Sequence, residues 1–195
     1  MKTSYEGVWH NSDANYKNYA LISKCGKYRW FFGSKTDFVG PEKRMIFKMI
    51  NPSTASHESD DPTVKSCRRI AEKNNCTDFC ILNFYPLRTP NVSDLDEWFA
   101  KTNIQEAFDV TGVSSMLVSM SIASAKENPK EIIFVVACGK FGKAKGLKEK
   151  FSAFLNKTED TPIFCLGQNQ DGSPMHPLFK AANTPLVSFN RGRVI

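Results

Sequence analysis

Short apolar runs alternate with polar, proline-bearing loops through the middle of the chain. Residues 45–50 and 79–82 are two such runs, and each has the length of a buried strand. Between them, Asp61-Pro62 is typical of a helix start, because an acidic cap precedes proline at the first helical position. Apolar residues then recur at helical spacing. This order predicts a right-handed βαβ unit whose two strands are parallel.

The same patterns predict elements on both sides of this unit. A hairpin that turns near Gly26 is expected over residues 19–32. The strand expected over 131–137 is entirely apolar after Glu131, which is typical of a central strand. The remaining expected elements are a helix after Ser93, helices over 109–126 and 145–155, and strands over 162–167 and 186–189. The helix over 109–126 should bury Val113, Met116, Leu117 and Met120 along one face.

These elements predict a single α/β domain over residues 1–195, a length sufficient for one real core. We expect a three-layer architecture with a mostly parallel sheet of about four core strands, helices on both faces and an N-terminal β-hairpin. Residues 1–18 are expected to form a polar N-terminal arm, and residues 191–195 a basic tail.

Composition narrows the class of protein. Apolar residues make up 41% of the chain and charged residues 24%, so we expect a folded globular protein. The six cysteines are scattered over the expected elements, which favours reduced, mostly buried thiols in a cytoplasmic protein. No apolar run has the length of a membrane span. Cys76 and Cys80 lack a second pair or a histidine cluster, so we expect neither a metal nor a cofactor.

The net charge of +6 favours an anionic partner such as nucleic acid. A basic protein without such a partner is the alternative.

Polar residues follow the expected strands, and ligands bind at the carboxyl ends of strands in open α/β sheets. Asn51 follows the first strand, Asn83 the second, and His176 lies in a loop after the last core strand. Each could contact a ligand; the alternatives are that the two amides hold their own turns and that His176 makes a structural hydrogen bond. Asp60 and Asp61 could orient water or a metal; the alternative is that they cap a helix.

Two further groups have equally open roles. Phe84 and Tyr85 could stack on a base or pack in the core. Lys140, in a Gly-Lys-Phe-Gly sequence, could meet a phosphate at a helix start, although the spacing is not that of a Walker motif.

Several motifs together resemble a family of bacterial and phage proteins described as domain of unknown function 1643. They are NPSTA (51–55), DDPT (60–63), LNFYPLRTP (82–90), GKFG (139–142) and LGQNQDGSPMHPL (166–178). The resemblance extends from about Tyr19 to Lys180 and implies no activity by itself.

A more distant resemblance is to the uracil-DNA glycosylase superfamily. Residues 49–53 are similar to its first proline-containing loop, where the residue before proline positions the attacking water; that role falls to Asn51. Residues 81–83 are similar to its Leu-Leu-Asn strand end, whose amide reads the base, and His176-Pro177 matches its His-Pro loop. The chain departs from the pattern in lacking the glycines of the first loop and in the eight residues 168–175 before His176.

We therefore expect a DNA glycosylase-like hydrolase that cleaves the N-glycosidic bond of a natural or modified base extruded from DNA. The alternatives are a hydrolase or transferase acting on a free nucleoside or nucleotide, and a non-catalytic module that binds nucleic acid or a nucleotide. The expected catalytic residues are Asn51, His176 and Asp61; the base contacts are Asn83, Phe84, Tyr85, Pro52 and Ser53; the phosphate contacts are Arg88, Lys140, Ser53 and Thr54.

Overall fold

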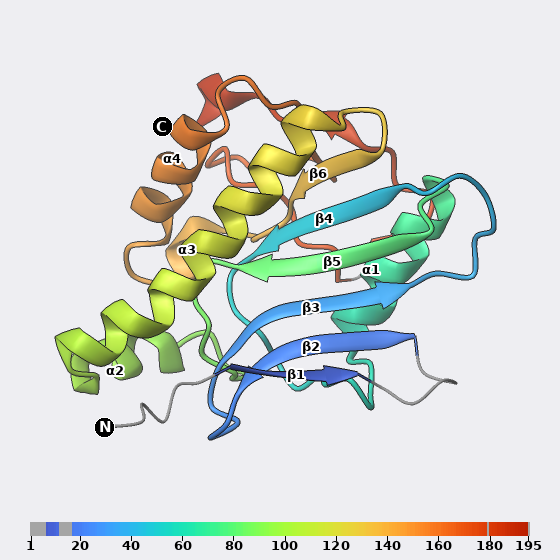
Figure 1. Cartoon of the computed structure of the whole chain (residues 1–195). Coiled ribbons are helices and arrows are strands. Elements are labelled where there is room, and N and C mark those ends of the chain that lie inside the picture. The colour runs from blue at the N-terminus through green and yellow to red at the C-terminus, as the bar shows by residue number, and fades with distance from the viewer. Residues whose placement is uncertain (1–6, 12–16, 179, 195) are drawn as a thin grey trace.

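In the computed structural model, residues 7–11, 17–178 and 180–194 are described. Their eight strands form one sheet in the order β1-β2-β3-β5-β4-β6-β7-β8 (Figure 1). The strands are β1 (Gly7–Asn11), β2 (Asn18–Ser23), β3 (Arg29–Lys35), β4 (Arg44–Met49), β5 (Asp78–Asn83), β6 (Ile132–Val136), β7 (Ile163–Cys165) and β8 (Val187–Ser188). The α-helices are α1 (Pro62–Lys73), α2 (Asp94–Lys101), α3 (Ile104–Glu127) and α4 (Leu147–Lys157).

The sheet is mixed, so the α/β class is confirmed but a mostly parallel sheet is wrong for the sheet as a whole. β4 runs parallel to β5 and β6, and β6 runs parallel to β7. The other four pairings, β1 with β2, β2 with β3, β3 with β5 and β7 with β8, are antiparallel. The difference arises because the N-terminal hairpin joins the edge of β5 and β8 is added to β7. Pairing between such distant segments is not encoded in local patterns.

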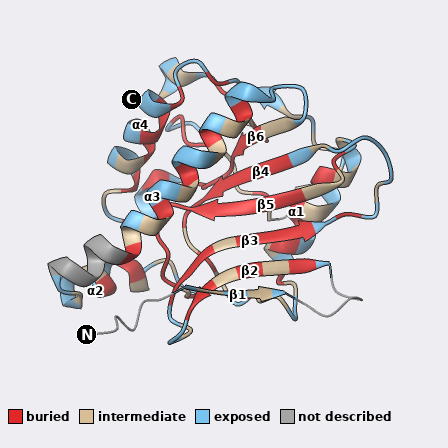
Figure 2. Cartoon of the chain, in the orientation of Figure 1, coloured by how far each residue is buried: buried red, intermediate tan, exposed pale blue. Residues whose placement is uncertain are grey.

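Side chains on successive strand residues point to opposite faces, and each face of the sheet has its own core. One core packs β4 and β5 against α1, through residues such as Phe47, Phe79 and Ile70. The other packs the opposite face against α2, α3 and α4, and includes Trp98 and Phe151. Buried residues accordingly cover the inner strands, while the outward sides of α3 and α4 are exposed (Figure 2). β4, β5 and β6 are parallel neighbours, so their carboxyl ends lie at the same edge of the sheet.

The face of α3 expected to be buried is correct at Val113 and Leu117, which are partly buried against the core, and wrong at Met116 and Met120, which are 55% and 62% exposed. Among the helix residues whose burial is described, the buried positions are Val110, Ser114, Val118, Ile122 and Ala125. Ser114 interrupts this apolar stripe, so counting apolar residues favoured the neighbouring face.

Both ends of the chain contribute to the fold where they are described. Residues 7–11, expected in a polar arm, form β1 against β2, while residues 1–6 and 12–16 of that arm lie outside the described part. In the expected basic tail, the Arg191 guanidinium donates to the carbonyls of Leu155, Thr158 and Thr161. These contacts satisfy backbone oxygens at and after the carboxyl end of α4.

The thiol expectation is confirmed, because all six cysteines are free and only Cys25 is exposed. None of the helices in the described part of the chain is both long and apolar enough to cross a bilayer.

Candidate functional site

A cavity of about 310 Å³ lies at the carboxyl ends of β4 and β5, beside the start of α1. We call it the strand-end cavity. It brings together six of the residues expected at the site, which come from three places: the loop between β4 and α1, the end of β5 and the loop after β7. These are Asn51, Ser53, Thr54, Asp61, Asn83 and His176, and Arg29, Thr89 and Lys143 also line it.

The Asn51 side chain has a fixed orientation. Its Nδ2 donates to the carbonyl oxygens of Pro52 at 2.9 Å and Thr89 at 2.8 Å, which uses both amide hydrogens. Thr89 in turn donates its backbone N–H to the Pro52 carbonyl at 2.9 Å. The amide therefore holds its loop, and its Oδ1, to which no described residue donates, remains an acceptor at the cavity wall.

The two neighbouring aspartates have different roles. Asp61 is the N-cap of α1, and its Oδ1 accepts from the Val64 N–H at 2.8 Å, which confirms the capping expectation. Its second oxygen has no hydrogen-bond partner among the described residues. Asp60 instead accepts from Arg68 at 2.7 Å and from Asn18 at 2.8 Å, so it stabilises the packing of α1 on β2.

Arg29 is a site residue that sequence patterns did not single out. It is 2% exposed, and its Nη1 donates to the Ala55 carbonyl at 2.6 Å, which fixes the loop after Asn51. Burial lowers the pKa of Arg29 to about 10, against the opposing charge of Asp61. Its Nε has no partner in the described chain. A buried cation therefore lies beside the Asp61 carboxylate at the cavity wall.

His176 lines the cavity as a neutral hydrogen-bond donor. Its Nδ1 accepts from the Leu178 N–H at 3.1 Å, so in the neutral ring the proton is on Nε2. Burial and the charge of Lys143 lower the pKa of His176 to about 4. At neutral pH the imidazole therefore offers an uncharged N–H group to a ligand.

The residues before His176 form a compact loop that positions it. Asn169 donates to the backbone and hydroxyl oxygens of Ser173, and the Gly139 N–H donates to the Pro174 carbonyl at 2.9 Å. Gly172 has φ +76°, and a Cβ there would lie 1.9 Å from the Arg193 carbonyl oxygen. Only glycine fits at this position. The residues between β7 and His176 thus contact both the end of β6 and the C-terminal segment.

Asn83 is the unusual group of the site. It is 3% exposed, and neither its Nδ2 nor its Oδ1 has a partner among the described residues. An unsatisfied buried amide of this kind destabilises a fold by about 1–3 kcal/mol. Asn83 lines the strand-end cavity and also a second cavity on the opposite face of the sheet. A ligand that satisfies both atoms would remove this penalty.

The structure separates five expected residues from the strand-end cavity. Phe84 points to the opposite face and packs against the rings of α4, and the Tyr85 hydroxyl donates to the Lys145 carbonyl. Pro52 is buried under its loop. The Arg88 Nη1 donates to the Gly26 carbonyl at 3.0 Å, in the hairpin. Lys140 is exposed and lines a neighbouring cavity with residues 168–171.

Lys48 is a second residue that sequence patterns missed. It lies in β4, is 2% exposed, and its Nζ donates to the Asn83 carbonyl at 2.7 Å. Burial lowers the pKa of Lys48 to about 7. The available signal was a lysine inside the apolar run 45–50, at a position whose neighbours are all buried.

No group of three His, Cys, Asp or Glu side chains within the described residues could hold a metal ion. Apart from the cationic groups of Arg29 and Lys143, the polar groups of the strand-end cavity are amides, hydroxyls, one imidazole and one carboxylate.

A family model described as "Protein of unknown function (DUF1643)" matches residues 29–178. The chain belongs to this family. The matched range begins at Arg29 and ends at Leu178, so it includes every residue that lines the strand-end cavity. No curated protein and no solved structure matches the chain.

Proposed function

We propose that the strand-end cavity binds a nucleobase in DNA, natural or modified, and that the protein hydrolyses its N-glycosidic bond. The observation that carries the proposal is the buried, unpaired amide of Asn83 in the same cavity as the neutral N–H donor of His176. A base edge presents adjacent donors and acceptors, and a side-chain amide can satisfy one of each. The base is therefore the ligand whose chemistry best complements this pair.

The reaction needs little more than these groups and one water. Breaking the N-glycosidic bond leaves its electron pair on the base and positive charge on the sugar. The Nε2–H of His176 would stabilise the departing anion, as preorganised donors do in oxyanion holes. Water would donate a hydrogen bond to Asn51 Oδ1 or to Asp61, and its oxygen would bond to the sugar carbon. Its proton would pass to Asp61, whose carboxylate would also stabilise the cationic sugar.

The charge around the cavity mouth supports a polyanionic substrate. Lys143 lines the cavity, and Lys140 is exposed three residues earlier in the same loop after β6. Basic side chains beside a base-sized cavity could hold the flanking phosphates of an extruded nucleotide. A volume of about 310 Å³ lies at the low end of ligand sites, which span roughly 300–1,000 Å³. It suits a single base with its sugar.

The resemblance to the uracil-DNA glycosylase superfamily supports the same function. Asn51, Asn83 and His176 occupy the three resembling positions, and all three line one cavity. The proposed relationship extends to the fold, in which β5, β4, β6 and β7 would be the counterparts of the superfamily's parallel core, with helices on both faces.

The test measures base release from the purified protein. Oligonucleotides that contain uracil or bulky modified bases, single- and double-stranded, are scored for abasic sites, while free nucleosides are assayed in parallel. We expect abasic sites with at least one base, and loss of this activity in Asn83→Ala but not in the exposed control Asn156→Ala on α4. Release from nucleosides alone would make DNA the wrong substrate. Binding of oligonucleotides without release would leave a binding module.

A further inference from the structure

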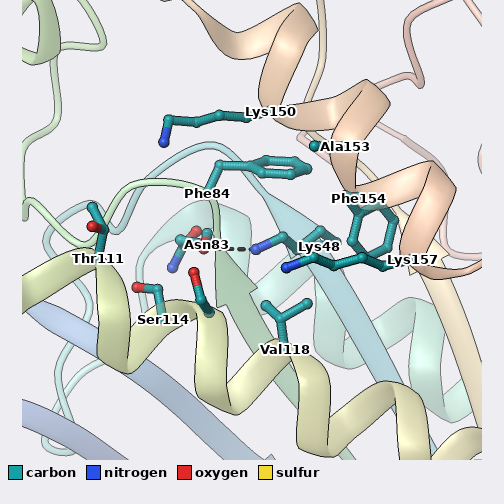
Figure 3. Close-up of a pocket in the computed structure, with 11 residues that line it drawn as sticks. Lys48, Asn83, Phe84, Thr111, Ser114, Val118, Lys150, Ala153, Phe154 and Lys157 are labelled. Atoms are coloured by element: carbon teal, nitrogen blue, oxygen red, sulfur yellow. Dashed lines mark hydrogen bonds between the residues drawn. The ribbon is translucent and has the colours of Figure 1, made fainter. Parts of the chain in front are cut away.

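The second cavity that Asn83 lines is a separate compartment on the face of α3 and α4. Its volume is about 210 Å³, and we call it the lysine cavity (Figure 3). Three lysines line it, Lys48 from β4 and Lys150 and Lys157 from α4. Hydroxyl groups of α3 form part of the opposite wall, from Thr111, Ser114 and Ser115.

The charge of this cavity is uncompensated within the described chain. None of the described residues that line it is acidic, and no ion pair within 4 Å joins Lys48, Lys150 or Lys157 to a described carboxylate. Lys48 is held between the Asn83 carbonyl and the face of Phe84, whose ring centroid is 4.2 Å from its Nζ. Burial lowers the pKa of Lys48 and also that of Lys150, which indicates that each lacks a counter-ion.

The titratable groups that face Lys48 do not supply this counter-ion. From α4 they are Lys150 and Lys157, and from the end of β6 the group is Cys138. Burial raises the pKa of the Cys138 thiol to about 12, so it is neutral at physiological pH. An anion from solution is the remaining source of negative charge.

The unpaired amide of Asn83, which also lines the strand-end cavity, is a second indication of a ligand beside the lysines. This side chain is more than nine-tenths buried and lines the lysine cavity beside the Lys48 ammonium group (Figure 3). Its Nδ2 can donate to an oxyanion together with the lysines and hydroxyls. Phe84, Phe154 and Val118 supply an apolar wall next to these donors.

We propose that the lysine cavity is a binding site for a small phosphomonoester, with the phosphate held by Lys48, Lys150 and Lys157. Three cationic donors match a group that carries nearly two negative charges and three acceptor oxygens. A volume of about 210 Å³ leaves room for only a small organic part, which would pack on Phe84. The site does not depend on base excision in the strand-end cavity.

Binding at this site is coupled to the protonation of Lys48. The phosphate favours the ammonium form, so binding takes up protons near pH 7 and weakens as pH rises. With the pKa of free Lys48 at about 7, raising the pH from 7 to 9 should lower affinity by between tenfold and a hundredfold. With a second pKa of about 6, phosphomonoesters are about nine-tenths dianionic at pH 7, so their own titration above pH 7 contributes little.

The test is calorimetric titration of the full chain with methyl phosphate, inorganic phosphate and acetate at pH 7 and pH 9. We expect phosphate compounds to bind at pH 7, acetate to bind more weakly, and affinity to fall at pH 9. Lys48→Met and Lys157→Met should each weaken binding about tenfold or more, because each removes a charge-assisted hydrogen bond. Lys148→Met, on the exposed side of α4, should bind as the parent does.

The outcomes separate the ligand sources. Tighter binding of methyl phosphate than of inorganic phosphate supports a phosphomonoester as the ligand. Equal binding overturns the proposal that the site recognises an organic group and leaves a site for phosphate alone. Lys157 is exposed, so its variant remains informative even if Lys48→Met does not fold. Absence of phosphate binding at millimolar concentration, acetate binding more tightly than phosphate, or unchanged affinity in Lys157→Met would overturn the lysine cavity as a phosphate site.

Discussion

Replacing Lys48 by methionine should stabilise the protein at neutral pH. The Lys48 Nζ is buried against the Asn83 carbonyl and the Phe84 ring. Methionine has a similar length and no charge, so it can fill the same space in the core. The substitution removes an ammonium group that the fold takes out of water without a counter-ion.

The size of the effect follows from the pKa of Lys48, which burial lowers from 10.5 to about 7. Between these values the unfolded chain binds more protons than the folded one, so stability rises with pH. The penalty from Lys48 is fully present below pH 7 and is lost above pH 10.5. Because one pKa unit corresponds to about 1.4 kcal/mol, the penalty is roughly 4 kcal/mol at pH 7 and about 1 kcal/mol at pH 10.

The assay is urea unfolding of parent and Lys48→Met at pH 7, 8, 9 and 10 in phosphate-free buffer. The stability advantage of the variant should shrink by about 3 kcal/mol across this range. Other titrating groups are common to both chains and cancel in the difference. Lys148→Met should show no such trend, because its side chain is exposed. A parent-to-variant difference that is independent of pH would refute a depressed pKa for Lys48.

Three further predictions concern the strand-end cavity. Titration of His176 should not change the excision rate between about pH 5 and 8, because burial lowers the pKa of His176 to about 4. A pH–rate profile that changes near pH 6.5 in the parent but not in His176→Gln would contradict this. Asp61→Asn should retain the α1 cap and lose the proton acceptor. Asp61→Ala should in addition lower the free energy of unfolding by about 1 kcal/mol, measured by urea unfolding. A chelator should leave the excision rate of the parent unchanged. Asn51→Ala should lower the single-turnover rate about a hundredfold with little change in DNA affinity. Lys140→Gln should instead weaken DNA binding and reduce by about one the slope of log affinity against log salt concentration. The reverse pattern would reassign both residues.

The βαβ unit could be predicted from sequence because its signals are local. An apolar run marks β4, Asp61-Pro62 marks the start of α1, and a second run marks β5. The convergence of Asn51 and Asn83 follows from this unit, since parallel strands bring their carboxyl ends to one edge.

The sheet edges could not be predicted in this way. The pairing of β3 with β5 joins segments separated by more than forty residues, and no local pattern encodes it. Arg29 is the first residue of β3, so its burial depends on the same pairing. Its hydrogen-bond partner, the Ala55 carbonyl, lies in a different loop.

Phe84 and Lys48 show what strand alternation could have revealed. Successive side chains of a strand point to opposite faces, so alternation predicts that Phe84, directly after Asn83, leaves the strand-end cavity; it lines only the lysine cavity. Lys48, between the buried Phe47 and Met49, faces the core of α3 and α4 by the same rule. An interior lysine is rare unless it is paired, and this makes it a signal of function.

The measurement that tests the central claim most directly is a single-turnover comparison of parent and Asn83→Ala over a panel of bases. Asn83 is proposed to read the base edge, so the variant should change the ranking of bases as well as lower the rate. Asn156→Ala should reproduce the ranking of the parent. Equal rates and an unchanged ranking in Asn83→Ala would contradict base recognition by the strand-end cavity.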